Sequence, residues 1–255
     1  MEHLNKFTAI VMAAGKGTRL GGVLPKPLSV VIDKESILSR IIKVLLKLNV
    51  IKIIIVVGYK SDEVINHVNQ NFQNTNNISF VIQNELNGTL NAVETGLTAV
   101  PEDSEQIIVL PADNGWFLKS KTLHTFTKEH LEKHAVVSIL LTKEFNDSLH
   151  KVEYKVSDNK VVDLKLRGDE QNDNQIYLAG TGILCIKKRY FLANKHLIKP
   201  LPNNEYTVSR IVEVALSQNK IVGYSVVDIN EVMTINTKED LQKLRSLAGN
   251  EAILE

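Results

Sequence analysis

The sequence is poor in cysteine, with Cys185 as the only one in 255 residues. A single cysteine excludes an intramolecular disulfide and a cysteine-rich zinc site. Long hydrophobic runs are also missing: the longest, such as IIIVV at 53–57, are far shorter than the roughly 20 residues that span a bilayer. The first residues lack the pattern of a signal peptide. We therefore expect a cytoplasmic protein without membrane insertion.

An excess of charge of one sign is absent as well, since 30 Lys and Arg face 29 Asp and Glu, for a formal net charge of +1. This balance argues against a protein built mainly to bind nucleic acid or an anionic membrane. Any phosphate binding must come from a local site. Hydrophobic residues make up 44% of the chain, which is enough to bury the core of one large domain or two small ones. Nothing in the composition indicates an oligomeric state.

In the first half of the chain, short apolar runs alternate with segments of helical spacing. This rhythm predicts a mostly parallel sheet with helices on both faces. We expect strands at 7–13, 51–59, 78–84, 106–113 and 135–142, and helices at 36–48, 61–72, 87–100 and 119–133, with Ser61 as the cap of the second helix.

The second half has a different pattern. Residues 152–166 predict a hairpin that turns at Ser157-Asp158-Asn159, and 176–188 predict a strand pair or one long bent strand. A helix is expected over 205–218, a strand over 221–229 and a last helix over 237–247, capped by Thr237. The fold class is therefore α/β, a three-layer αβα sandwich around a mixed, mostly parallel sheet.

The first strand leads directly into an unusual loop, and the stretch reads TAIVMAAGKGTRLGGVLPKPL. Ligands of open α/β sheets bind beyond the carboxyl ends of the strands. Gly15 and Gly17 allow backbone N–H groups to approach a phosphate closely. Arg19 and Lys26 add two cations, and prolines on both sides of Lys26 stiffen its backbone.

Two familiar phosphate-binding motifs do not fit this loop. A dinucleotide fingerprint needs a third glycine where Leu20 stands, and Pro25 and Pro27 prevent a helix soon after. The Gly-Lys-Ser/Thr of a P-loop is absent too. A long glycine loop with two positioned cations suits a triphosphate. The alternative is a surface turn with two solvated charges.

The stretch resembles the signature of the sugar-phosphate nucleotidyltransferases, and the resemblance extends over nearly the whole chain. It implies the Rossmann-like fold of the nucleotide-diphospho-sugar transferases in a single domain over 1–255. The nucleotide-binding half would cover about 1–115 and the acceptor-binding half about 116–255. The resemblance assigns catalysis to Arg19 and Lys26, and nucleotide binding to the loop residues Met12, Ala13, Ala14, Gly15, Gly17 and Thr18.

The resemblance continues in the segments that would hold the base and a metal. Gln83, Gly88 and Thr89 match the segment that holds the pyrimidine in uridylyltransferases, although Gln83 could also be a solvated strand end. Asp113 and Asn236 match the two ligands of Mg²⁺, which prefers one or two carboxylates beside phosphate oxygens. Asn236 could also be a simple turn or cap residue.

For the acceptor, Gly180, Thr181, Gly182 and Glu205 match the family's binding segments, although Glu205 could instead stabilise a helix amino terminus. The Glu and Asn that hold the sugar in the acetylglucosamine-1-phosphate enzymes fall near Leu166 and on Gly180, and 149–151 replace a glycine stretch. These departures indicate a different acceptor. The hairpin region is similar to that of the inositol-1-phosphate cytidylyltransferases.

The resemblance thus implies a Mg²⁺-dependent enzyme that joins CTP or UTP to a sugar-1-phosphate or a polyol phosphate such as inositol-1-phosphate, and releases pyrophosphate. A cytidylyltransferase acting on phosphocholine or a molybdopterin-type acceptor is an alternative, and so is an inactive homologue that senses nucleotide.

Other residues favour structural interpretations. His130 and His134 stand four apart on a predicted helix, and without a third ligand nearby we expect a solvated helix surface rather than a zinc site. Cys185 is expected in the core. Trp116 and Phe117 could either close over a substrate or cap the sheet.

Overall fold

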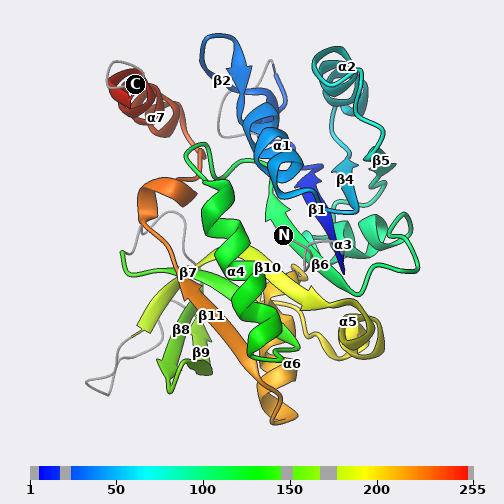
Figure 1. Cartoon of the computed structure of the whole chain (residues 1–255), viewed down its shortest axis with the longest axis vertical. Coiled ribbons are helices and arrows are strands. Elements are labelled where there is room, and N and C mark those ends of the chain that lie inside the picture. The colour runs from blue at the N-terminus through cyan, green and yellow to red at the C-terminus, as the bar shows by residue number, and fades with distance from the viewer. Residues whose placement is uncertain (1–5, 18–23, 145–151, 167–176, 252–255) are drawn as a thin grey trace.

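A computed structural model describes residues 6–17, 24–144, 152–166 and 177–251 (Figure 1). Its main sheet has nine strands, seven of them in the order β11-β7-β10-β6-β1-β4-β5, and β8 and β9 extend the sheet beside β10. Their bounds are β1 Phe7–Ala13, β4 Lys52–Val57, β5 Ile78–Ile82, β6 Gln106–Pro111, β7 Val137–Thr142, β8 Val152–Ser157, β9 Lys160–Leu166, β10 Tyr177–Lys187 and β11 Val222–Val226. A small second sheet pairs β2 (Val30–Ile32) with β3 (Glu35–Ser36).

Helices cover both faces of the main sheet, as expected for three layers (Figure 1). One face packs against α1 (Ile37–Leu48), α2 (Ser61–Asn71), α4 (Ser120–Glu132) and α7 (Lys238–Glu251). The other packs against α3 (Thr89–Leu97), α5 (Lys188–Asn194) and α6 (Ile211–Ser217). No helix in the described ranges is long and apolar enough to cross a membrane.

The central strand β1 shows why the sheet needs both layers. Its side chains alternate between two separate apolar clusters, with Ala9 and Val11 on the side of α1 and Ile10 on the side of α3. All three are fully buried. A strand buried on both faces is a continuous apolar run, which is how it was recognised in the sequence. Cys185 lies fully buried in β10, as expected for a core residue.

Strand β10 makes the sheet mixed. It runs antiparallel to both β6 and β7, whereas β1, β4, β5 and β6 pair in parallel. The region 176–188 is therefore one long strand, with a register shift between Gly180 and Leu184 that bends it. The hairpin β8–β9 turns at Asp158 and Asn159, whose positive φ angles suit a tight two-residue turn.

The prolines after the opening loop have the expected effect. Lys26 to Leu28 form only a single 3₁₀ turn, and Pro27 is buried in it. The first α-helix begins at Ile37, where the Ser36 side chain accepts the N–H of Ser39 at 3.1 Å. The carboxyl ends of the parallel strands β1, β4 and β6 meet at one edge of the sheet, and the first α-helix after β1 begins only well beyond this edge.

Several expected boundaries were wrong. Ser61 does not cap α2: Lys60 precedes the helix in a left-handed conformation, and no side chain caps it. The helix expected from 205 begins as α6 at Ile211, because the residues before the 3₁₀ turn Val208–Arg210 form a loop. The short helix α5 directly continues β10 and was not predicted.

His130 is not a solvated surface residue, and that expectation is corrected. Its ring is 1% exposed and lies within hydrogen-bond distance of the Ser138 hydroxyl (2.8 Å) and of the Gln106 side-chain oxygen (3.2 Å). His134 follows the end of α4 with a positive φ of 50°. Burial of the ring, together with the positive charge of Lys187, lowers the pKa of His130 to about 4.

We expect this histidine to make folding sensitive to acid. Below pH 6.5 the unfolded chain binds a proton at His130, whereas the folded chain does so only near pH 4. Stability is therefore present above pH 6.5 and is lost as the pH falls towards 4, by about 2 kcal/mol between pH 7 and pH 5. Urea unfolding of the wild type and of His130→Gln at both pH values measures this. If both proteins lost the same free energy of unfolding between pH 7 and pH 5, His130 would not be the source of the acid sensitivity.

Candidate functional site

A cavity of about 770 Å³ opens at the carboxyl edge of the sheet. Every described residue that the sequence analysis placed in a site lines this cavity: Met12, Ala13, Ala14, Gly15, Gly17, Lys26, Gln83, Gly88, Thr89, Asp113, Gly180, Thr181, Gly182, Glu205 and Asn236. Thr18 and Arg19 lie outside the described residues. Segments from both halves of the chain thus converge on one space, as the rule for ligands of open α/β sheets predicts.

The glycine loop packs closely against its neighbours. The Ala14 carbonyl accepts the N–H of Tyr59 at 3.1 Å, which ties the loop to the end of β4. Gly17 has a positive φ of 59°, and a Cβ there would lie 2.7 Å from the Cβ of Lys26. The loop therefore needs glycine at 17 for its conformation and for its contact with Lys26. A Cβ on Gly15, by contrast, would meet nothing within 4 Å.

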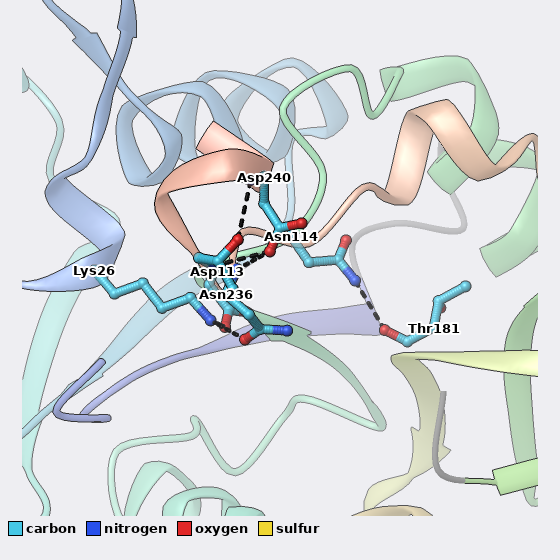
Figure 2. Close-up of polar contacts among 7 residues, drawn as sticks. Lys26, Asp113, Asn114, Thr181, Asn236 and Asp240 are labelled. Atoms are coloured by element: carbon cyan, nitrogen blue, oxygen red, sulfur yellow. Dashed lines mark hydrogen bonds and ion pairs between the residues drawn. The ribbon is translucent and has the colours of Figure 1, made fainter. Parts of the chain in front are cut away.

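The Lys26 ammonium lies between two oxygens from distant parts of the chain (Figure 2). It donates a short hydrogen bond to the Asp113 carboxylate and another, of 2.7 Å, to the Asn236 Oδ1 atom. The Lys26 side chain is only 11% exposed, so its charge depends on these partners. Both residues expected to hold a metal therefore already point at the same cation.

The turn that carries Asn236 is firmly built. The Thr237 hydroxyl accepts the N–H of Asp240 at 3.1 Å, and the Asp240 carboxylate accepts the N–H of Thr237 at 2.9 Å. This reciprocal pair is a capping box, and it confirms Thr237 as the cap of the last helix. The helix is further held by Arg245, whose Nη2 donates to the Val30 carbonyl at 2.7 Å.

Gln83 is 5% exposed and is not a solvated strand end. Its side-chain nitrogen donates to the Glu85 carbonyl at 2.9 Å and to the Asn91 Oδ1 atom at 2.8 Å. Both hydrogens of the amide are used in this way, which orients the side chain and leaves its oxygen as the group that can receive a ligand hydrogen bond.

Gly88 and Thr89 contact the loop that precedes α6. The Tyr206 carbonyl accepts the N–H of Leu90 at 3.1 Å, and the Thr89 hydroxyl accepts the N–H of Val208 at 3.0 Å. A Cβ on Gly88 would lie 2.3 Å from the Tyr206 carbonyl oxygen. These contacts join the segment assigned to the base and the segment assigned to the acceptor.

Glu205 lies in this loop and not at a helix start, so the proposed helix-stabilising role is wrong. Its backbone N–H donates to the Asn203 side chain at 3.1 Å, and its carbonyl accepts the N–H of Leu201 at 2.9 Å. These bonds fold the loop into a turn whose residues Leu201, Asn203, Asn204, Glu205, Thr207 and Val208 line the cavity.

Two further residues, Tyr154 and Asn114, lie buried in the cavity wall and were not predicted. A Cβ on Gly180 would lie 2.7 Å from the Tyr154 ring, so the glycine leaves room for the aromatic side chain. Burial raises the pKa of the Tyr154 hydroxyl, although its hydrogen bond with Ser209 opposes this in part, and the phenol stays neutral. Asn114 donates to the Thr181 carbonyl at 2.9 Å.

Trp116 and Phe117 belong to the apolar cluster on the α1 face and do not line this cavity. The Trp116 carbonyl accepts a hydrogen bond from Arg40 at 3.3 Å, and the Arg40 guanidinium lies 5.9 Å from the centre of the indole. Of the two roles considered for this pair, the structure supports capping of the sheet.

The sequence is similar to a family and to known proteins. The family model described as Nucleotidyl transferase matches residues 8–231. The bifunctional protein GlmU of Carboxydothermus hydrogenoformans is 28% identical over 239 residues, which cover 92% of this chain and 51% of that protein. This chain thus spans about half the length of the first curated relatives it matches. A protein of Acanthamoeba polyphaga mimivirus, described as a probable UDP-N-acetylglucosamine pyrophosphorylase, is 26% identical, with 96% of this chain and 97% of that protein covered.

Solved structures share the fold. A UDP-glucose pyrophosphorylase in complex with UDP-glucose superposes on this chain with a TM-score of 0.75 at 14% identity. The match covers 96% of this chain and 98% of that one. A nucleoside-diphosphate-sugar pyrophosphorylase of Vibrio cholerae RC9 superposes with a TM-score of 0.73 at 14% identity, and the match covers 93% of this chain and 99% of that one. The α/β fold implied by the opening motif is confirmed.

We expect Gly88→Ala to destabilise the protein and Gly15→Ala to leave its stability nearly unchanged. Gly88 has φ 94° and ψ −177°, a conformation essentially restricted to glycine, and its Cβ would also collide with a backbone carbonyl. Gly88→Ala should lower the free energy of unfolding by about 2 kcal/mol. Thermal denaturation of the two variants beside the wild type measures it, and equal midpoints for both variants would contradict the argument.

Proposed function

Because the chain belongs to the nucleotidyl transferase family, we propose that it joins CTP or UTP to a sugar-1-phosphate or a polyol phosphate such as inositol-1-phosphate, and releases pyrophosphate. The observation that carries this proposal is the meeting of Lys26, Asp113 and Asn236 in the cavity that the glycine loop also lines. A cation beside a carboxylate and an amide oxygen, next to a glycine loop that lines the same cavity, suits a triphosphate.

The proposed step needs no nucleophile from the protein. A phosphate oxygen of the acceptor attacks the α-phosphorus of the triphosphate. A new P–O bond forms there, and the bond from the α-phosphorus to the bridging oxygen breaks, so that pyrophosphate leaves with the electron pair. The second pKa of a phosphate monoester is near 6, so the acceptor is already a dianion at neutral pH and needs no general base. Alignment and charge neutralisation remain as the work of the protein.

We assign Lys26 to the charge that grows on the α-phosphoryl group. Its ammonium is held at the carboxyl edge by a stiff Pro-Lys-Pro backbone and by contact with Gly17. From the sequence motif, Arg19 is assigned to the triphosphate and the leaving pyrophosphate. The loop glycines would place backbone N–H groups against the same phosphates.

Asp113 and Asn236 are the residues that would hold Mg²⁺. Their donor set suits this ion, because carboxylate and amide oxygens are hard ligands and both already converge on a cation, the Lys26 ammonium. Bound there, Mg²⁺ would neutralise phosphate charge beside the reacting α-phosphorus. The protein contributes the convergence of the two oxygens, which come from the end of β6 and from the turn before α7.

The side-chain oxygen of Gln83 is the group we assign to the base. An acceptor oxygen suits a pyrimidine, since uracil offers its N3–H and cytosine its 4-amino group. Because the amide nitrogen is bonded to Glu85 and Asn91, the oxygen cannot exchange places with it without losing two hydrogen bonds. This supports CTP and UTP equally.

The acceptor is assigned to the part of the cavity formed by Gly180, Thr181, Gly182 and Glu205. Gly180 stands at the position where the amino-sugar enzymes of the resemblance carry an Asn, and a Cβ there would lie 2.7 Å from the Tyr154 ring, which supports a different sugar or a polyol. The mimivirus relative, however, is named for UDP-N-acetylglucosamine. The amino sugar therefore belongs among the acceptors to be tested.

Pyrophosphate release with Mg²⁺ tests the proposal. CTP, UTP, dTTP, ATP and GTP are each paired with inositol-1-phosphate, glucose-1-phosphate, N-acetylglucosamine-1-phosphate and phosphocholine. We expect release from a pyrimidine nucleotide with a sugar or inositol phosphate, and mass spectrometry should find the joined product. Release with phosphocholine alone would contradict the proposed acceptor class. Tight nucleotide binding without release from any pair would favour an inactive homologue.

We expect Lys26→Ala to change catalysis and metal binding in opposite directions. Loss of a charge that stabilises the transition state should lower kcat by about 100-fold or more. The same change frees two oxygens and removes a like charge, so the affinity for Mn²⁺ without nucleotide should rise by about tenfold or more. Pyrophosphate release and the EPR signal of free Mn²⁺ measure the two effects.

Lys43→Ala is the matched control, because Lys43 pairs with Glu35, is 55% exposed and does not line the cavity. It should leave both quantities unchanged. Near-normal turnover in Lys26→Ala would refute the catalytic role of Lys26. An unchanged or weaker Mn²⁺ affinity would refute the idea that the metal and Lys26 use the same oxygens of Asp113 and Asn236.

A further inference from the structure

The Asp240 side chain makes one hydrogen bond more than a helix cap requires. A capping box consists of the two bonds between Thr237 and Asp240 described above. The same carboxylate oxygen of Asp240 also accepts the N–H of Asn236 at 2.8 Å (Figure 2). Asn236 precedes the cap residue, so this bond adds nothing to the helix itself. It fixes the peptide of the residue assigned to the metal.

The chain before Asn236 is also fixed, by the strand end that carries the other assigned ligand. The buried Ile235 donates its N–H to the Asp113 carbonyl at 3.1 Å, and Thr234 forms a bridge with Asn114. Asn236 is thus held from one side by the backbone of Asp113 and from the other by the carboxylate of Asp240. An asparagine has two side-chain torsions, so a fixed backbone leaves only these to place its Oδ1 atom, which accepts the hydrogen bond of Lys26.

We propose that Asp240 is a positioning residue for the Asn236 amide oxygen. It does not line the cavity and acts through the Asn236 peptide. The inference rests on the proposed function, because it takes Asn236 as a metal ligand. Mg²⁺ and the similar Mn²⁺ demand defined geometry from their ligands, and the groups that orient a ligand typically change metal affinity by 10- to 100-fold when they are removed.

The chain offers a matched control for the helix cap. Thr237→Ala and Asp240→Ala each remove one side chain of the capping box, so both should lower the Tm by similar amounts. Only Asp240→Ala also releases the Asn236 peptide. Asp240→Asn keeps an oxygen that can accept the N–H groups, and it serves as the conservative variant if Asp240→Ala folds poorly. Mn²⁺ binding without nucleotide is measured on the full chain from the EPR signal of free Mn²⁺.

We expect Asp240→Ala to weaken Mn²⁺ binding by about tenfold, Thr237→Ala to stay within about twofold of the wild type, and Asp240→Asn to recover most of the loss. Equal Mn²⁺ affinities in Asp240→Ala and Thr237→Ala would overturn the positioning role. Asn236→Ala is measured beside them. A wild-type affinity in Asn236→Ala would show instead that the metal assignment of the proposed function is wrong, and the inference would fall with it.

Discussion

The site depends on one buried charge. The Lys26 ammonium contacts Asp113 and Asn236, which lie 87 and 210 residues further along the chain. A charge that is 11% exposed requires such partners, so the loop after β1, the end of β6 and the turn before α7 must all be in place for it to be satisfied. The site is consequently complete only when almost the whole chain has folded, although each part belongs to a separate local element.

The fold was predictable where local pattern and tertiary burial agree. The run of β1 is apolar from Ala9 to Ala13, and Ser36 stands directly before a segment of helical spacing. Prediction failed where a distant contact overrides the local pattern. His130 was predicted on a solvated surface, because two histidines four residues apart in a helix give no indication of burial. In the structure its ring is buried and lies within hydrogen-bond distance of Ser138 and Gln106. The start of α6 was predicted too early, because residues 205 and 206 pack against Gly88 as part of a loop and do not continue the helix.

The candidate site was predictable in its location and less so in its detail. Motif residues at the ends of parallel strands must meet at one edge, which is why the described members of the predicted set line a single cavity. Tyr154, Asn114 and Asp240 escaped because their importance lies in contacts across the fold: a ring against Gly180, an amide bonded to the Thr181 carbonyl, and a carboxylate bonded to the Asn236 peptide. No spacing in the sequence indicates such contacts. Arg19 lies outside the described residues, so its role stays a prediction.

The burial of Cys185 has a practical consequence for spectroscopy. Its thiol is the only one in the chain and lies near the carboxyl end of β10 with no exposed surface. Burial raises the pKa of this thiol well above the ordinary value. Thiol reagents react with the thiolate, so this position is protected in the folded protein. A single cysteine introduced on the surface could therefore carry a fluorophore or spin label at a defined place without prior removal of a native thiol. Distances between such labels and a bound nucleotide analogue could then report how the two halves of the cavity respond to ligand in solution.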